Sequence, residues 1–189
     1  MAAICVFCGS NSGADPVYAR AAAELGRALA VNGHSLVYGG GHVGLMGVVA
    51  DAVLAEGGSV VGVMTEQLVA AEVAHGGLTE LVITPSMHER KAMMARRSDA
   101  VVVLPGGFGT LDETFEIITW NQLGLVSMPV VFFDIDGYYE SLFDFVQSSV
   151  AAGFVSQSHA SSAHRASTID AVLACLDAPP PAFTPKWTG

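Results

Sequence analysis

The order of short apolar runs and helical segments is the feature that most constrains how this chain folds. Short runs rich in β-branched and other apolar residues predict strands at residues 4–8, 35–38, 59–63, 80–84, 100–104 and 130–133. Helical spacing between them predicts helices at 16–32, 45–56, 87–97, 111–123 and 138–152. Strands that are apolar throughout are typical of a parallel sheet covered by helices. We therefore predict an α/β fold: a doubly wound parallel sheet with helices on both faces.

The chain shows no repeat or linker that would divide it. Its 189 residues are enough to bury one core. We predict a single domain over residues 1–178 and an extended tail over 179–189. The sequence "STID" at 167–170 predicts a capped start of the last helix. The segment "SQSHASSAHRA" before it has a poor pattern, so a seventh strand there is left open.

Composition and charge narrow the function classes. The apolar runs are far shorter than the roughly 20 residues that span a bilayer, and the N-terminus has no basic flank of a secretory signal. We expect a cytoplasmic protein with no membrane association. The formal charge of −10 disfavours nucleic acid, because its phosphates would be repelled. Four of the eight Lys and Arg residues nevertheless fall in "RKAMMARR", which favours a small anion as ligand.

Three cysteines are too few for a disulfide scaffold. Cys5 and Cys8 form a C-x-x-C pattern, but they fall in a predicted strand, where residues i and i+3 point to opposite faces. We interpret them as buried, reduced thiols. The six histidines show no metal-binding spacing, and we predict no metal site.

Four loops follow predicted strands at the edge where open α/β sheets bind ligands. They are "CGSNSG", which contains Ser10, "YGGGHVGLMG", "TPSMHERK" and "LPGGFGT". The second matches G-x-G-x-x-G, but it follows the second strand and no acidic residue ends the next one. We interpret its glycines, Gly40 and Gly41 among them, as positions where the backbone approaches a ligand or a neighbouring loop.

The segment "LPGGFGTLDE" has the properties of an anion site, although it lacks the lysine of a Walker A motif. Its glycines let backbone N–H groups turn toward a ligand, and a helix N-terminus adds partial positive charge. The role of Glu113 has two interpretations. Thr110 and Glu113 have the spacing of a capping box, and Glu113 could equally be a catalytic carboxylate.

The segment "TPSMHERK" places cations at an unusual position. Ser86 and Glu89 predict a helix start, so Arg90 and Lys91 lie only one turn into the helix, where the helix dipole disfavours positive charge. An anion held nearby would explain both residues. Arg96 and Arg97 suit the other end of the same helix, and a role for Arg97 beside Arg90 is left open.

Three of these segments have the order and spacing of one family's motifs. "YGGGHVGLMG", "MHERKAMM" and "PGGFGTLDE" resemble the signatures of the Lonely Guy proteins, which are cytokinin riboside 5′-monophosphate phosphoribohydrolases. "ITWNQLG" and "DGYY" extend the resemblance, which covers roughly residues 3–155. Phe108 replaces a frequent Tyr, and Asp112 replaces a frequent Glu.

The resemblance implies a Rossmann-like domain and a homodimer with active sites near the subunit contact. It implies an N-glycosidase that hydrolyses N6-substituted adenosine 5′-monophosphates to free base and ribose 5-phosphate, without metal or other cofactor. Arg90 and Glu113 are implied as the catalytic pair. The substrate-binding residues that we assign from the motifs and loops are Ser10, Gly40, Gly41, Glu72, Lys91, Gly106, Gly107, Phe108, Gly109, Thr110, Leu111, Asp112 and Thr119.

Three alternatives remain at this point. Proteins of this kind have carried the label lysine decarboxylase, but a pyridoxal enzyme needs a Schiff-base lysine, for which only Lys91 and Lys186 are available. A general purine-nucleotide nucleosidase acting on AMP would use the same residues. A nucleotide- or cofactor-binding carrier on the same fold would bind phosphate without needing Glu113.

Overall fold

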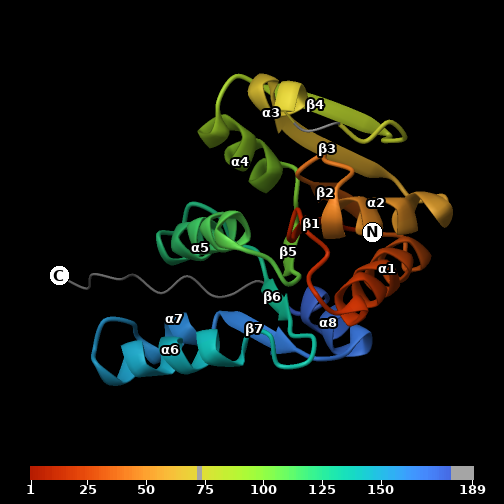
Figure 1. The fold of residues 1–189 in the computed structure, drawn as a ribbon. Helices are drawn as coiled ribbons and strands as arrows, with labels where there is room; N and C mark the ends of the chain where they lie inside the picture. The colour runs from red at the N-terminus through yellow and green to blue at the C-terminus, as the bar shows by residue number, and fades with distance from the viewer. Residues whose placement is uncertain (72–73, 180–189) are drawn as a thin grey trace.

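The computed structural model describes residues 1–71 and 74–179. Seven strands form one sheet in the order β4-β3-β2-β1-β5-β6-β7, and every neighbouring pair is parallel. The elements in chain order are β1 (Ala3–Phe7), α1 (Pro16–Val31), β2 (Ser35–Tyr38), α2 (Gly44–Ala55), β3 (Val60–Thr65), α3 (Glu66–Ala71), β4 (Glu80–Thr84), α4 (Met87–Arg96), β5 (Ala100–Val103), α5 (Phe108–Gln122), β6 (Val130–Phe133), α6 (Glu140–Ala151), α7 (Gln157–Ala160), β7 (Ala163–Ala166) and α8 (Ile169–Leu176). The predicted α/β fold is confirmed (Figure 1).

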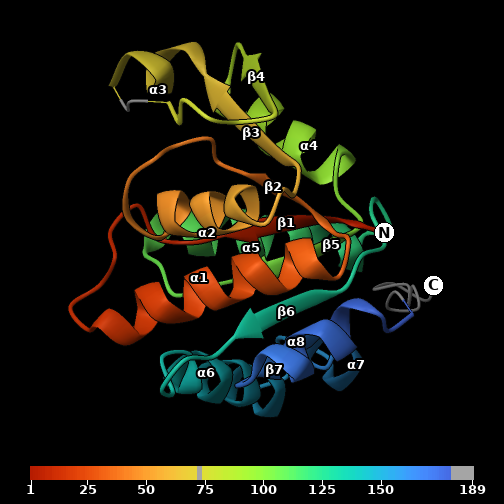
Figure 2. The same cartoon turned by 90° about the vertical axis from the view of Figure 1, so that its right-hand side faces the viewer.

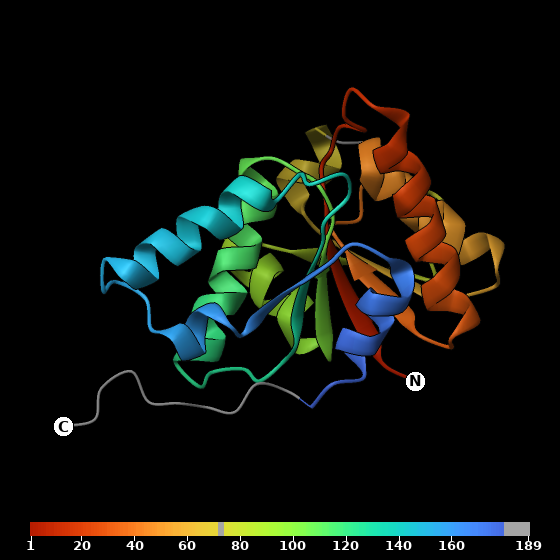
Figure 3. The same ribbon diagram turned by 90° about the horizontal axis from the view of Figure 1, so that it is seen from below.

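Helices cover both faces of the sheet, and each face has its own core. One core joins the strands to α1, α2 and α8, with Leu25, Val49 and Val172 buried. The other joins them to α4 and α5, where Met94 and Ile117 are buried, and α6 packs against it. Figure 2 shows α1 and α2 in front of β1, and Figure 3 shows α5 and α6 on the opposite side from α1 and α8.

Strand β1 marks the point where the strand order reverses, since β2 pairs on one side of it and β5 on the other. The chain leaves β1 and β5 in loops that lie against each other, and the Gly9 N–H donates to the Pro105 carbonyl at 3.0 Å. Such a reversal opens a crevice at the carboxyl ends of the strands, where ligands bind in folds of this class.

The structure differs from the sequence prediction at short and polar elements. A seventh strand exists as β7, a four-residue edge strand of sequence AHRA that pairs only with β6 among the described strands. Helices α3 and α7 have six and four residues, too few to show a helical period in sequence. Helix α8 is capped by Thr168, one residue later than the "STID" pattern predicted. The predicted tail lies, apart from Pro179, outside the described residues.

None of the helices in the described ranges has the length and apolar character needed to cross a bilayer.

Candidate active site

A cavity of about 510 Å³ lies at the carboxyl edge of the sheet, within the size range of ligand pockets. It forms between the loop after β1, the start of α2, the loop after β5 and the first turns of α4 and α5. The loop after β5 supplies the wall from Pro105 to Thr110, which contains three glycines, and Arg90 and Glu113 supply the charged groups.

The glycine loop starts helix α5 without a side-chain cap. The N-cap is Gly107, and no side chain of the described residues accepts a hydrogen bond from the first turn. The first N–H of α5 that donates to a carbonyl of its own helix start is that of Leu111, which donates to the Gly107 carbonyl at 3.1 Å. A Cβ at Gly107 or Gly109 would meet no described atom within 4 Å apart from its chain neighbours and the adjacent helix backbone. The first-turn N–H groups are therefore open to an anion.

The capping-box interpretation of Glu113 is wrong. Because α5 begins at Phe108, Thr110 already lies inside the helix and Glu113 lies in its second turn. The Thr110 side chain instead packs against Gly106, where even one added carbon would collide with it. Glu113 reaches across to α4, and its Oε1 accepts a hydrogen bond from Arg90 Nη1 at 2.8 Å.

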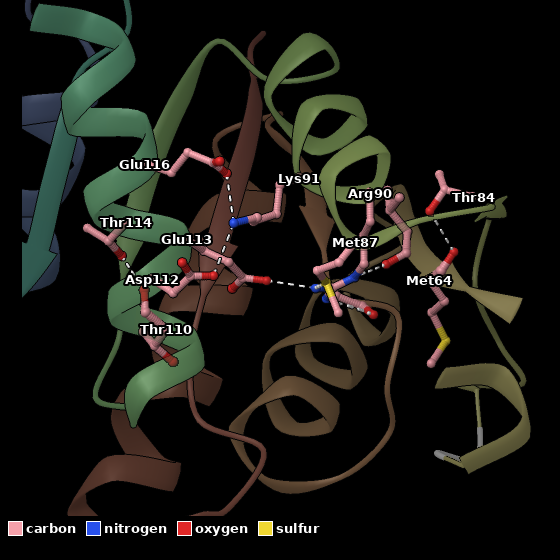
Figure 4. Close-up of polar contacts among 12 residues, drawn as sticks. Met64, Thr84, Met87, Arg90, Lys91, Thr110, Asp112, Glu113, Thr114 and Glu116 are labelled. Atoms are coloured by element: carbon pink, nitrogen blue, oxygen red, sulfur yellow. Dashed lines mark hydrogen bonds and ion pairs between the residues drawn. The ribbon is translucent and has the colours of Figure 1, made fainter. Parts of the chain in front are cut away.

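Arg90 is held by partners from several segments of the chain. Its Nε donates to the Val63 carbonyl at 2.9 Å, and its Nη2 to the Gly39 carbonyl at 3.4 Å. Nη1 contacts the Met87 sulfur at 3.5 Å as well as Glu113. Figure 4 shows the side chain extended from α4 toward α5. Only 9% of the Arg90 side chain is exposed, so its guanidinium is fixed before any ligand enters.

The environment of Glu113 disfavours its ionised form. Burial raises the pKa of Glu113, and the adjacent Arg90 offsets that effect only in part, so the pKa remains above its ordinary value. The side chain is 14% exposed and lines the cavity. A carboxyl group with a displaced pKa beside an open cavity is typical of a catalytic acid or base.

Lys91 turns away from this pair. Its Nζ lies 3.1 Å from Asp112 Oδ2 and 3.1 Å from Glu116 Oε2, so it joins α4 to α5 (Figure 4). Desolvation lowers the pKa of Lys91, but the bonds to the two carboxylates outweigh it and raise the pKa overall. The anions that the sequence led us to expect beside Arg90 and Lys91 are thus carboxylates of α5. Arg97 pairs with Glu80 at 2.6 Å, at the opposite end of α4 from Arg90.

The second glycine segment approaches Arg90 rather than the cavity. A Cβ on Gly39 would lie 2.5 Å from Arg90 Nη2, and one on Gly40 would lie 2.5 Å from the Met64 side chain. Gly40 also has a φ of 83°, which favours glycine. Gly44 has a φ of 60° and packs against the backbone of Ser10. These glycines let the loops after β1 and β2 approach each other, and let the loop after β2 approach strand β3 and Arg90.

The cavity brings together part of the predicted site. The predicted residues that line it are Ser10, Arg90, Gly106, Gly107, Phe108, Gly109, Thr110 and Glu113. Those that lie outside its lining are Gly40, Gly41, Lys91, Leu111, Asp112 and Thr119. Thr119 lines a separate, mostly apolar groove between α5 and α6. Glu72 lies outside the described residues.

Sequence reasoning missed several apolar and aromatic residues of the lining, which include Tyr18, Leu45, Met46, Leu68, Met87 and Tyr138. Leu45, Met46, Met87 and Tyr138 all belong to segments recognised as motifs, "YGGGHVGLMG", "MHERK" and "DGYY", and that was the available signal. Leu68 lies on the short helix α3, which had not been predicted.

The cysteine interpretation is confirmed. Cys5 and Cys8 are buried, unpaired and packed into the cores on opposite faces of the sheet. Burial, acting with the nearby Glu113 charge, raises the pKa of both thiols far above the ordinary value. They are therefore inert thiols near neutral pH.

A glycine loop at the switch point of a parallel sheet, beside a buried Arg–Glu pair, is typical of α/β proteins that bind anionic ligands. Residues 46–176 match the family model described as "Possible lysine decarboxylase". The chain is 53% identical over 156 residues to "Probable cytokinin riboside 5′-monophosphate phosphoribohydrolase LOGL9" of Oryza sativa subsp. japonica, covering 82% of this chain and 69% of that protein. It is 49% identical to "Cytokinin riboside 5′-monophosphate phosphoribohydrolase LOG7" of Arabidopsis thaliana, covering 81% and 70%. The chain belongs to the Lonely Guy family.

Solved structures share the fold at low sequence identity. The molybdenum cofactor carrier protein of Chlamydomonas reinhardtii superposes with a TM-score of 0.69 at 22% identity, covering 91% of this chain and 93% of that one. DNA processing protein A of Helicobacter pylori gives a TM-score of 0.55 at 15% identity, with coverages of 92% and 79%. Both likenesses concern the fold alone.

The lysine decarboxylase description does not fit the lysines. The Lys91 ammonium is held between Asp112 and Glu116 and does not line the cavity. Lys186 lies outside the described residues. Among the described residues, the cavity lining therefore contains no lysine that could form a Schiff base with a pyridoxal group.

Proposed function

We propose that this protein hydrolyses the N-glycosidic bond of N6-substituted adenosine 5′-monophosphates, releasing the free base and ribose 5-phosphate. The observation that carries the proposal is the buried Arg90–Glu113 pair, 2.8 Å apart, on the wall of a cavity that also contains the glycine loop. Relatives that are about half identical over four-fifths of this chain are named as phosphoribohydrolases of this kind.

The glycine loop would hold the 5′-phosphate. Its open N–H groups and the N-terminus of α5 offer hydrogen bonds and partial positive charge to an anion. Binding energy from the phosphate is remote from the bond that breaks, and it fixes the position of the ribose. Gly106, Gly107, Phe108, Gly109 and Thr110 are the residues of this proposed subsite.

Glu113 would act on the sugar. Cleavage of a ribosyl C–N bond develops oxocarbenium charge at C1′, by analogy with glycosidases. A carboxylate beside C1′ stabilises that charge and orients the attacking water. Water supplies hydroxide to C1′ and a proton to the departing base, so no other reactant is required.

Arg90 would position Glu113. Three of its contacts are to the Val63 and Gly39 carbonyls and to Met87, so the guanidinium stays in place when the cavity is empty. A fixed cation beside Glu113 also favours its ionised form, against the effect of burial. Such preorganisation means that the site need not rearrange as charge develops.

The predicted residues outside the cavity would support it indirectly. Lys91 and Asp112 tie α4 to α5, which carry Arg90 and Glu113. Gly40 and Gly41 lie in the loop that brings the Gly39 carbonyl to Arg90. For Leu111, Thr119 and Glu72, direct substrate contact remains a prediction from the family motifs.

A second copy of the chain would cover the apolar surface of α5, α6 and their following turns. Its exposed large hydrophobic residues are Phe115, Leu123, Leu125, Phe145 and Phe154. Such a patch on a charged, acidic protein is typical of a protein interface. Light scattering should give a dimer, and Phe145→Ser should weaken it, whereas Val31→Ser on the opposite face of the sheet should not. A monomeric wild-type protein would contradict this part of the proposal.

No nucleic-acid ligand is proposed, because the chain carries a formal charge of −10. A nucleotide monophosphate substrate agrees with the cytoplasmic location expected from the sequence.

The decisive experiment measures release of free base. The protein is incubated with isopentenyladenosine 5′-monophosphate and with AMP, and the products are separated by chromatography. We expect release of isopentenyladenine at a higher rate than adenine. Comparable rates on both nucleotides would indicate a general nucleosidase. Binding of both without release of either base would indicate a carrier and refute the hydrolase.

A further inference from the structure

Two consecutive tyrosines hold the loop that follows β5. The Tyr138 hydroxyl donates to the Gly106 carbonyl at 2.7 Å, and the Tyr139 hydroxyl donates to the Leu104 carbonyl at 2.7 Å. Both tyrosines come from the segment between β6 and α6. They differ in location, because Tyr139 is 2% exposed in the core, whereas Tyr138 is 43% exposed and lines the cavity.

We propose that Tyr138 is a positioning residue for the phosphate subsite, acting through the Gly106 carbonyl. The inference rests on the function proposed above, and it assigns to this side chain a task that the family motifs did not. A trans peptide group is planar, so its carbonyl and the following N–H point in opposite directions. A hydrogen bond that fixes the Gly106 carbonyl therefore also fixes the direction of the Gly107 N–H, which would otherwise turn with the peptide.

The packing around the loop differs on the two sides of that peptide. On one side, Gly106 is pressed so closely against Thr110 and Gly9 that a Cβ would collide with both. On the other side, Gly107 and Gly109 have open space around the position of a Cβ. Glycine adopts more backbone conformations than any other residue. The open side of the Gly106–Gly107 peptide is the side where packing does not fix it, and the Tyr138 hydroxyl adds a restraint there through the Gly106 carbonyl.

The Tyr138 ring is held in turn by its neighbours. It packs edge-on against Tyr139, with ring centroids 4.9 Å apart, and against Tyr18, with centroids 5.8 Å apart. Removal of the hydroxyl alone would leave these ring contacts intact. The change Tyr138→Phe therefore isolates the hydrogen bond to Gly106 from the packing of the side chain.

The experiment compares Tyr138→Phe with Tyr139→Phe in the full chain. Each variant loses a tyrosine hydroxyl, the two tyrosines are adjacent, and each hydroxyl bonds a carbonyl of the same loop. For Tyr138→Phe we expect KM for the nucleotide to rise about tenfold while kcat stays within about threefold, the pattern of lost uniform binding. The dissociation constant of ribose 5-phosphate, measured by calorimetry, should rise by a similar factor. The Tm of Tyr138→Phe should stay within about 3 °C of that of the wild type.

Tyr139→Phe should show the opposite pattern. Its hydroxyl is buried, so its loss leaves the Leu104 carbonyl without that partner and lowers Tm by more than Tyr138→Phe does. The KM and the affinity for ribose 5-phosphate should change less than twofold. Equal effects of the two variants on ribose 5-phosphate affinity would show a general loosening of the loop and would overturn the inference.

The remaining outcomes separate this inference from the proposed function. Unchanged ribose 5-phosphate affinity and KM in Tyr138→Phe, with a wild-type protein that binds ribose 5-phosphate, would overturn the inference alone. A wild-type protein that binds no ribose 5-phosphate would refute the phosphate subsite and the inference together.

Discussion

The change Glu113→Gln tests the central contact of the site. If Glu113 capped helix α5, Gln would serve nearly as well and stability would not change. The structure predicts otherwise, because Gln removes the charge from a pair in which the Arg90 side chain is 9% exposed and the Glu113 side chain 14%. Gln keeps an acceptor for Arg90, whose other partners remain, and burial already disfavours the charge that is removed, so the expected loss is smaller than that of a full charge-assisted bond, about 1 kcal/mol.

Stability and turnover should both respond. A loss of that size lowers Tm by about 2–4 °C in a chain of this length, measured by calorimetry. Turnover should fall about 10²–10³-fold, because the amide does not stabilise positive charge at C1′. The matched control is Glu116→Gln, which makes the same change one turn later on α5. Glu116 contacts Lys91, which keeps Asp112 as a partner, so turnover should stay within about threefold.

The outcome that refutes this reasoning is specific. A Glu113→Gln variant with wild-type turnover would show that the carboxylate does not act on the substrate. A wild-type Tm would show that the Arg90–Glu113 pair does not stabilise the fold, as is the case for some buried ion pairs.

Three further predictions concern pH, the glycine loop and helix α4. The pKa of Glu113 is raised, and the proposed reaction requires its ionised form. The value of kcat/KM should therefore fall as the pH drops through that raised pKa. In a pH–rate profile, the acid limb should lie above the ordinary pKa of a glutamate. Gly106→Ala should lower stability by about 1–3 kcal/mol in denaturant titrations, because its Cβ would contact Thr110 and lie 2.8 Å from the Gly9 nitrogen, whereas Gly109→Ala, with open space around it, should not. Ser86→Ala should cost about 1 kcal/mol, read as a lower Tm, because the Ser86 hydroxyl caps α4 by accepting from the Glu89 N–H at 3.2 Å.

The parts of the fold that follow from local chemistry could be predicted from the sequence. Helix α1 begins where Asp15 and Pro16 indicated, and the Asp15 carboxylate accepts from the Val17 N–H at 2.8 Å. The buried strands were visible as apolar runs, since parallel strands are covered on both faces. The edge strand β7 carries His164 and Arg165, and that pattern gives no such signal.

The candidate site was less predictable, because its contacts join distant segments. The spacing of Thr110 and Glu113 is that of a capping box, but the partner of Glu113 is Arg90, 23 residues away. A local pattern could not reveal that α5 begins at Phe108, three residues before the predicted start at Leu111. The position of Lys91 only one turn into its helix did indicate nearby negative charge, but not that Asp112 and Glu116 would provide it.

The contacts of Arg90 also have a consequence for refolding. Its partners Gly39, Val63 and Glu113 are 51, 27 and 23 residues away in the chain. Contacts between such distant segments form only after the loops between them have closed. The guanidinium can therefore reach its final place only when the ends of β2 and β3 and the start of α5 have come together. During refolding from denaturant, hydrolytic activity should return after the far-ultraviolet signal of the helices. The delay between the two signals would report when the ends of β2 and β3 and the start of α5 have come together around Arg90.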